Sequence, residues 1–269
     1  MARIEVNGTV LSYEDRGCGR EAVVFSHGLL MSGRMFEAQA AALSGPYRVI
    51  TYDHRGQGRS EVAEHGYDMD TLTDDAAALI EALGAAPCHF VGLSMGGFVG
   101  LRLAARRPEL IRSLTLLATS AEAEHPVSAR RYRWLARIAG WVGFRPLVGR
   151  ILPILFGHSW LADPTHAEER ALWRQRLATN DRRGTLRAAR GVIERAGVVD
   201  ELANIAAPTL IVVGDEDRAT PPPRARRIAE GIGHARLERL AGCGHSPTVE
   251  RPDAVTALLR EFLENRPGG

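Results

Sequence analysis

Ser94 lies in a glycine-bracketed turn whose residue types and spacing suit a nucleophile. The segment 92–96 reads Gly-Leu-Ser-Met-Gly, with the strand-like run 89–91 before it and the helical run 97–107 after it. A serine at an abrupt strand-to-helix turn holds its hydroxyl clear of the sheet, and the small residues two positions away let neighbouring chains pass closely. The start of the helix also favours developing negative charge. The pattern therefore predicts that Ser94 is the nucleophile of an acyl-transfer reaction.

A serine hydroxyl reacts readily only when a base removes its proton, and His245 is the predicted base. It lies in the glycine-rich loop 242–247, which follows the predicted strand 236–240. Sites in α/β sheets form at the edge where the strands have their carboxyl ends, and this loop lies at that edge. The other eight of the nine histidines are interpreted as surface or turn residues: His27, His54, His65, His89, His125, His158, His166 and His234.

A carboxylate is expected to hold the histidine in one tautomer and to stabilise its charged form. Three acids, Asp215, Glu216 and Asp217, follow the predicted strand 209–213 directly. We predict Asp217 as the partner because it lies deeper in the loop, with Asp215 as the alternative. A solvated turn or a helix cap is the simpler interpretation of Asp215 and Glu216. The chain order Ser, Asp, His is the order expected for this kind of nucleophile turn.

The oxyanion that forms during acyl transfer needs hydrogen-bond donors. One predicted donor is the backbone amide of Met95, the residue after the nucleophile. The other is the amide of Leu29, in the loop after the predicted strand 22–25, where Gly28 lets the backbone turn. This set of groups requires no metal and no organic cofactor, and none is expected.

Strand and helix patterns alternate over the first third of the chain and again near its end. The predicted strands are 4–6, 10–14, 22–25, 47–52, 89–91, 114–118, 209–213 and 236–240, and the predicted helices are 34–43, 72–83, 97–107, 224–231 and 254–263. The pair Asn7-Gly8 predicts a hairpin turn. Strands separated by helices predict an α/β fold with a mostly parallel sheet and helices on both faces.

The segment 121–196 has a different composition. It shows no strand pattern, and it contains all four tryptophans and 14 of the 34 arginines, against seven acidic residues. A shift of this kind indicates an inserted helical unit. We therefore predict that residues 1–120 and 197–269 form the α/β core and that residues 121–196 are a helical insertion in it.

Composition excludes several other classes of protein. All 34 basic residues are arginine, and a chain without lysine can have neither a P-loop nor a pyridoxal Schiff base. A net charge of +2 argues against a dedicated nucleic-acid binder. Three scattered cysteines suggest neither a disulfide framework nor a zinc site. No apolar run approaches the roughly 18 residues of a membrane span, and no signal sequence is evident, so a cytoplasmic protein with no membrane partner is expected.

Together these motifs resemble the α/β-hydrolase superfamily over nearly the whole chain. The segment Asp53–Ser60 is similar to the family's D-x-R-G-x-G-x-S loop, which the resemblance implies is structural and close to the site. The resemblance also implies that residues 121–196 form a cap over the active site. Serine at the nucleophile position argues against the haloalkane dehalogenases and epoxide hydrolases, which use aspartate. The sequence is most similar to small capped esterases, 3-oxoadipate enol-lactonases and hydrolases that split C–C bonds of aromatic meta-cleavage products.

The function expected from these observations is hydrolysis of a small carboxylic ester or lactone through an acyl-enzyme on Ser94. Hydrolysis of a C–C bond in a diketo acid by the same residues is the alternative within enzymes, and a ligand-binding protein with little turnover is the alternative outside them. An arginine inside the cap would favour an anionic substrate, since guanidinium pairs with carboxylate. Arg130, Arg131 and Arg133 are the candidates, although a solvated helix face is the simpler interpretation of them.

Overall fold

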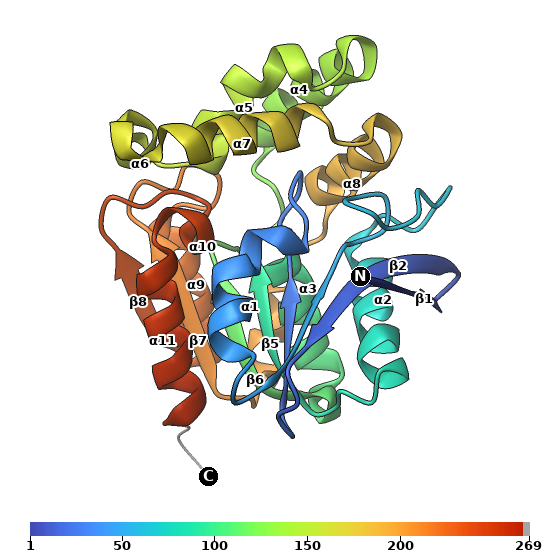
Figure 1. The fold of residues 1–269 in the computed structure, drawn as a ribbon, viewed down its shortest axis with the longest axis vertical. Coiled ribbons are helices and arrows are strands. Elements are labelled where there is room, and N and C mark those ends of the chain that lie inside the picture. The colour runs from blue at the N-terminus through green and yellow to red at the C-terminus, as the bar shows by residue number, and fades with distance from the viewer. Residues whose placement is uncertain (266–269) are drawn as a thin grey trace.

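The computed structural model describes residues 1–265, and residues 266–269, which the sequence predicts to be frayed, lie outside this range. Eight strands form one sheet in the order β1-β2-β4-β3-β5-β6-β7-β8. The strands are β1 (Ala2–Val6), β2 (Thr9–Arg16), β3 (Ala22–Ser26), β4 (Arg48–Tyr52), β5 (Cys88–Leu93), β6 (Ile111–Leu117), β7 (Thr209–Gly214) and β8 (Arg236–Leu240). Figure 1 shows the sheet in the lower part of the molecule.

Most of this sheet is parallel, as predicted. The pairs β1–β2 and β2–β4 are antiparallel, and every pairing from β4 to β8 is parallel. The β1–β2 hairpin turns at Asn7 and Gly8, whose φ angles are 46° and 68°. Because parallel strands end at the same edge, the loops after β3, β5, β7 and β8 meet there. This edge therefore collects the four loops in which the sequence places its candidate site residues.

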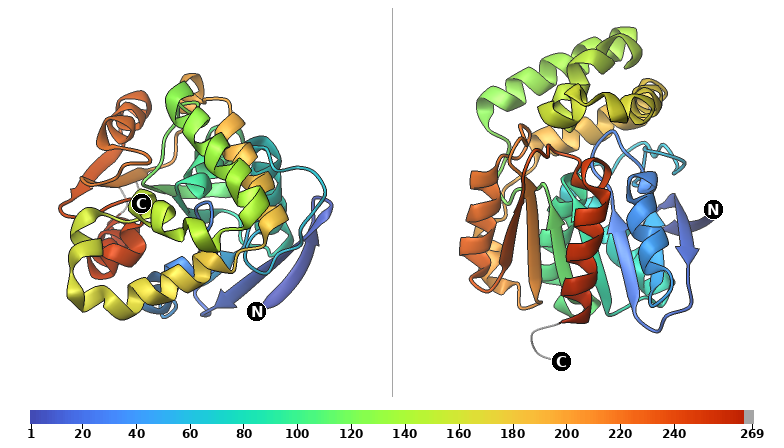
Figure 2. Two further views of the ribbon diagram at one scale, coloured as in Figure 1. Left: turned by 90° about the horizontal axis from the view of Figure 1, so that it is seen from above. Right: turned by 60° about the vertical axis from the view of Figure 1, so that its left-hand side comes forward.

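Helices cover both faces of the sheet (Figures 1 and 2). On one face are α1 (Glu37–Leu43) and α11 (Pro252–Glu264), and on the other are α2 (Met69–Ala82), α3 (Met95–Arg106) and α9 (Pro222–Ile232). Successive residues of a strand point to opposite faces of the sheet. In β3, Val23 and Phe25 therefore pack on the face covered by α1 and α11, and Val24 packs on the face covered by α2, α3 and α9. No helix within residues 1–265 is both long and apolar enough to cross a bilayer.

Every predicted strand and helix is present, and the differences lie at the ends. Helix α2 begins three residues before the predicted Leu72 because the Asp68 carboxylate accepts a hydrogen bond from the Thr71 amide at 2.9 Å and caps the helix there. Helix α3 begins at Met95, two residues earlier than predicted. The predicted helix 34–43 is divided into a 3-10 turn, Gly33–Phe36, and α1.

A helical insert connects β6 to β7 and lies over the carboxyl edge of the sheet (Figures 1 and 2). Its helices are α4 (Pro126–Val142), α5 (Val148–Leu155), α6 (His158–Ala162), α7 (Ala167–Ala178) and α8 (Arg182–Glu194). We call this insert the cap. Of the residues described, none between 121 and 196 is in a strand, as predicted. The exact limits of the cap, 121 and 196, stay a prediction.

The four tryptophans of the cap divide into two groups. Trp160 and Trp173 are buried, and Trp160 stacks on Phe156 with 4.6 Å between ring centroids. Trp134 and Trp141 on α4 remain 56% and 85% exposed. The buried pair belongs to the same core as α1 and α11, so the cap and the α/β core share one apolar interior.

A buried ion pair ties the loop Asp53–Ser60 to helix α2. The Arg55 guanidinium binds both carboxylate oxygens of Asp75, with 2.6 Å between Nε and Oδ2, and both side chains are buried. The Asp53 carboxylate accepts hydrogen bonds from the amides of Gly33 at 2.8 Å and Arg59 at 2.9 Å. These contacts hold the loop beside the end of β3.

Replacing Asp75 by alanine is expected to lower the free energy of unfolding by about 3–5 kcal/mol, because the Arg55 charge would stay buried without its partner. Urea denaturation measures this change. Asp74→Ala is the matched control: Asp74 is the exposed neighbour in the same helix, and its loss should cost no more than about 0.5 kcal/mol. Equal losses in the two variants would contradict the assigned role of the pair.

Candidate active site

Ser94 occupies the sharp turn between β5 and α3 with a φ of 51°, in the left-handed region that residues with side chains seldom adopt. Glycine is needed on both sides of it. A Cβ at Gly96 would overlap the carbonyl oxygen of Ser26 in β3, and a Cβ at Gly92 would overlap the Gly96 carbonyl. The glycine spacing seen in the sequence therefore allows β3, β5 and α3 to approach closely enough to form the turn.

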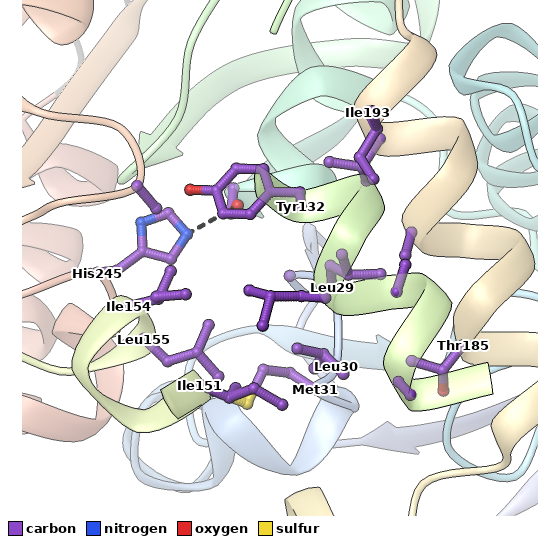
Figure 3. Close-up of a pocket in the computed structure, with 18 of the residues that line it drawn as sticks. Leu29, Leu30, Met31, Tyr132, Ile151, Ile154, Leu155, Thr185, Ile193 and His245 are labelled. Atoms are coloured by element: carbon purple, nitrogen blue, oxygen red, sulfur yellow. Dashed lines mark hydrogen bonds between the residues drawn. The ribbon is translucent and has the colours of Figure 1, made fainter. Parts of the chain in front are cut away.

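Ser94, His245 and Asp217 form one hydrogen-bonded chain. The distance from Ser94 Oγ to His245 Nε2 is 2.9 Å, and Asp217 Oδ2 and Oδ1 lie 2.9 Å and 3.0 Å from His245 Nδ1. All three residues are buried. Figure 3 shows the hydrogen bond of His245 at the edge of a cavity. The arrangement places a base on the nucleophile and a carboxylate behind the base.

The loop after β7 fixes which acid reaches the histidine. The Asp217 carboxylate accepts hydrogen bonds from the amides of Ala219 at 2.8 Å and Thr220 at 2.9 Å, and from the Thr220 hydroxyl at 2.9 Å. Asp215, the alternative considered from the sequence, is exposed. Glu216 instead accepts a hydrogen bond from the Ser159 amide of the cap at 2.8 Å. The geometry therefore brings Asp217 to His245 and leaves the other two acids aside.

Charges around His245 decide its proton affinity. Burial alone would lower the pKa of the imidazole, but the charge and the hydrogen bond of Asp217 outweigh it, and Glu250 and Glu124 act in the same direction. The pKa of His245 therefore lies above the ordinary histidine value of about 6.5. The imidazolium that forms when Ser94 loses its proton is stabilised by the same carboxylates.

Glu250, in the short helix α10 (Pro247–Glu250), holds the His245 loop, and the sequence did not identify it. Its buried carboxylate accepts hydrogen bonds from the amides of Gly244 at 2.8 Å and Ser246 at 2.9 Å, on the two sides of His245. It also accepts one from the cap residue Gly157 at 2.8 Å. Burial raises the pKa of Glu250, although the three amides oppose this shift. Glu250 lies three residues after Pro247, and nothing in the sequence around it distinguishes it from a glutamate on the surface.

The loop after β3 and the start of α3 each bring one backbone amide to the site, that of Leu29 and that of Met95. Gly28 packs against Ser94, because a Cβ placed on it would lie 3.4 Å from the Ser94 Cβ. Leu30 is held by its amide, which donates to Gln57 Oε1 at 2.9 Å, and its φ is 69°. Among the hydrogen bonds of residues 1–265, none is donated by the amides of Leu29 or Met95. Both amides are thus available to an oxyanion.

Three of the histidines interpreted from the sequence as surface or turn residues are buried, so a surface position is wrong for His27, His54 and His89. His27 and His54 lie in the loops after β3 and β4, whereas His89 lies within β5, so a turn position is wrong for His89 as well. His27 Nδ1 lies 2.7 Å from the Gly28 carbonyl oxygen, and its Nε2 accepts a hydrogen bond from the His54 amide at 2.9 Å. Burial lowers the pKa of both His27 and His54, which therefore remain neutral. Their contacts fix the loop that carries Leu29. Their positions, directly after a buried strand or within one, were the feature of the sequence that could have indicated burial.

A cavity of about 150 Å³ lies between the core and the cap, and Ser94 and His245 open into it. Its walls are mainly aliphatic and aromatic side chains from α4, α5, α8 and the loop after β3, among them Leu30, Met31, Leu135, Ile151, Leu155 and Ile193 (Figure 3). Engineered apolar cavities of roughly this size bind benzene. The cavity therefore fits a small apolar group next to Ser94.

The hypothesis that a cap arginine binds a substrate carboxylate is wrong for all three candidates. Arg130, Arg131 and Arg133 are exposed, and no arginine is among the described residues that line the cavity. The charged residue that does line it is Glu124, whose carboxylate is paired with Arg195 at 3.0 Å. An apolar cavity with an acid in its wall disfavours an anionic substrate.

Comparisons with known proteins agree with this fold. A family model described as the alpha/beta hydrolase fold matches residues 21–252. An enol-lactonase from Burkholderia xenovorans LB400 is 31% identical, with a TM-score of 0.91 over 98% of this chain and 100% of that one. A thermophilic esterase from Thermogutta terrifontis is 30% identical, with a TM-score of 0.91 over 98% of each chain. A protein of Pseudomonas syringae that carries the name carbamate hydrolase RutD is 31% identical over 91% of this chain and 94% of its own.

Gly96→Ala is expected to lower the free energy of unfolding by about 3 kcal/mol, because the added methyl group would overlap the Ser26 carbonyl. Thermal unfolding followed by circular dichroism measures the change. The control is Gly149→Ala in α5, where a Cβ meets nothing within 4 Å and helix propensity predicts a gain of up to about 1 kcal/mol. If Gly96→Ala unfolded at the temperature of the unaltered protein, the close approach would not be required.

Proposed function

Because the chain belongs to the α/β-hydrolase family, we propose that it hydrolyses a small, uncharged carboxylic ester or lactone through an acyl-enzyme on Ser94. The observation that carries this proposal is the buried chain of hydrogen bonds from Ser94 through His245 to Asp217, open to an apolar cavity. Serine, histidine and carboxylate in this order form the catalytic unit of serine hydrolases.

The reaction follows from the positions of these groups. His245 Nε2 takes the proton of Ser94 as Oγ attacks the carbonyl carbon, and Asp217 stabilises the resulting imidazolium. The amides of Leu29 and Met95 donate hydrogen bonds to the oxyanion. His245 then gives the proton to the leaving oxygen. In the second half of the reaction the same histidine activates a water molecule, which releases the acid and restores Ser94.

Two kinds of observation favour an ester or a lactone. The solved structures that this chain resembles include an esterase and an enol-lactonase. The cavity lacks an arginine for a second carboxylate within the described residues, which disfavours the diketo acids of C–C bond hydrolysis. A neutral acyl or alkyl group of a few carbons satisfies both the size and the apolar character of the cavity.

A series of p-nitrophenyl esters, acetate, butyrate and octanoate, tests this function. We expect kcat/KM to be highest for acetate or butyrate and lower for octanoate, because an apolar cavity of about 150 Å³ favours a short acyl chain. In Ser94→Ala, turnover should fall by roughly 10⁴-fold or more. Initial rates of p-nitrophenol release measure both effects.

The outcomes separate the rival functions. Equal rates with and without the Ser94 hydroxyl would reject the acyl-enzyme. Absence of turnover on every ester would redirect the search to bleaching of a conjugated diketo acid, the mark of C–C bond hydrolysis. Tight binding of a ligand with turnover slower than its release would favour a binding protein.

The pH dependence of kcat/KM tests the role of Asp217. His245 can accept the Ser94 proton only while it is neutral, so activity is lost as the pH falls through its pKa. Because that pKa lies above 6.5, the acid limb should have its midpoint above pH 6.5. In Asp217→Asn the carboxylate charge is lost, so burial would lower the pKa of His245 and the acid limb should move to lower pH. The plateau value of kcat/KM should fall by roughly 10⁴-fold.

Asp215→Asn is the matched control for this profile, since it removes an exposed carboxylate from the same loop. It should leave both the midpoint and the plateau in place. A profile that moves equally in the two variants would mean that general charge, and not the Asp217 contact, sets the proton affinity of His245.

A further inference from the structure

Tyr132 of helix α4 is a polar side chain in the mostly apolar wall of the catalytic cavity. Figure 3 shows its hydroxyl pointing toward His245 and away from Leu29. The pKa of Tyr132 is raised first by burial and then by the charge of Glu124, with a smaller contribution from Asp217. Among residues 1–265, no hydrogen bond involves the Tyr132 hydroxyl. The phenol is therefore a free donor beside the triad.

The other hydroxyls of the cavity wall close to His245 are already committed. Thr220 Oγ1 donates to Asp217 Oδ2 at 2.9 Å, and Ser246 Oγ donates to the Leu155 carbonyl oxygen at 2.7 Å. Thr185 lies on α8, at the far end of the cavity from His245 in Figure 3. Among the described residues that line the cavity, Tyr132 is therefore the one, apart from Ser94 itself, whose side-chain hydroxyl lies near His245 and makes no other hydrogen bond.

The side of the site on which this hydroxyl lies determines what it can bind. The carbonyl oxygen of a substrate faces the amides of Leu29 and Met95, whereas the leaving oxygen faces His245 Nε2, which must protonate it. We propose that Tyr132 donates a hydrogen bond to the leaving oxygen of the ester or lactone and so adapts the site to poor leaving groups. This inference rests on the proposed function of Ser94.

The step balances without any further reactant. Ser94 Oγ forms a bond to the carbonyl carbon and its proton moves to His245 Nε2. The bond from that carbon to the leaving oxygen then breaks, its electron pair stays on the oxygen, and His245 returns the proton to it. Tyr132 keeps its own proton throughout and stabilises the charge on the leaving oxygen by the hydrogen bond. In a lactone the oxygen stays attached to the acyl group, and the new hydroxyl remains beside Tyr132.

The surroundings of Tyr132 favour this role. Burial raises the pKa of its phenol, so the hydroxyl stays protonated at neutral pH. Glu124, the nearby acid, is held by Arg195 at 3.0 Å and by Arg224 at 3.5 Å. The cavity wall in which Tyr132 lies is mostly apolar, and a hydrogen bond to a developing negative charge is stronger in such surroundings than in water.

Tyr132→Phe tests the proposal with two butyrate esters that form the same acyl-enzyme. Ethyl butyrate has a poor leaving group, and p-nitrophenyl butyrate has a good one that needs little help. We expect kcat/KM to fall about 10- to 100-fold for ethyl butyrate, measured by pH-stat, and less than about threefold for p-nitrophenyl butyrate. In a series of aryl butyrates, log kcat/KM should then depend more steeply on the pKa of the leaving phenol.

A structural role would not produce this selectivity. The phenylalanine variant keeps the ring, and its unfolding temperature shows whether packing is intact. Thr185→Val, which removes the hydroxyl at the far end of the cavity, should change both esters by the same factor. Equal effects of Tyr132→Phe on both esters, or no effect on ethyl butyrate, would overturn the inference while leaving Ser94 in place. If the unaltered protein hydrolysed neither ester faster than Ser94→Ala does, the proposed function would be wrong, and this inference would be wrong with it.

Discussion

The left-handed turn at Ser94 is the constraint on which the rest of the site depends. A residue with a side chain held at a φ of 51° costs on the order of 1–3 kcal/mol, so neighbouring contacts must enforce it. The Ser94 amide donates to the Leu117 carbonyl oxygen at 2.9 Å, and Thr119 Oγ1 donates to the Ser94 carbonyl oxygen at 2.8 Å. On the opposite side, Gly96 lets α3 pass against β3. The turn therefore exists only where β3, β5 and β6 lie side by side with their carboxyl ends at one edge.

The cap is fixed over this turn from two sides, and each anchor reaches a part of the site. The Glu250 carboxylate joins the amide of Gly157 in the cap to the loop that carries His245. On the other side, Asn180 Nδ2 donates to the Leu30 carbonyl oxygen at 2.9 Å, next to the amide of Leu29. Because the anchors and the site residues share loops, a displacement of the cap would disturb the base and the oxyanion donors together.

The sequence predicts those site residues whose position depends only on which strand they follow. Ser94, Asp217 and His245 each follow a strand of the parallel part of the sheet, and parallel strands end at one edge, so their meeting could be expected. Glu250 could not be found in this way, because it follows no strand and because one of the three amides that it binds, that of Gly157, is 93 residues away. The arginine hypothesis failed for a similar reason: the pattern of residues 130–133 is helical, but only the packing of α4 against α8 decides which side faces the cavity, and the arginines face solvent.

The raised pKa of His245 and the position of Tyr132 are two parts of one problem. The charge of Asp217 makes the imidazole a stronger base, which helps it to take the proton of Ser94. The same charge makes the imidazolium a weaker acid, so it gives the proton less readily to a basic leaving oxygen. A neutral phenol beside that oxygen stabilises its charge without competing for the proton of Ser94. A site with a strong base for the first step thus gains most from a hydrogen-bond donor in the second, and in this protein the cap supplies the side chain that can provide it.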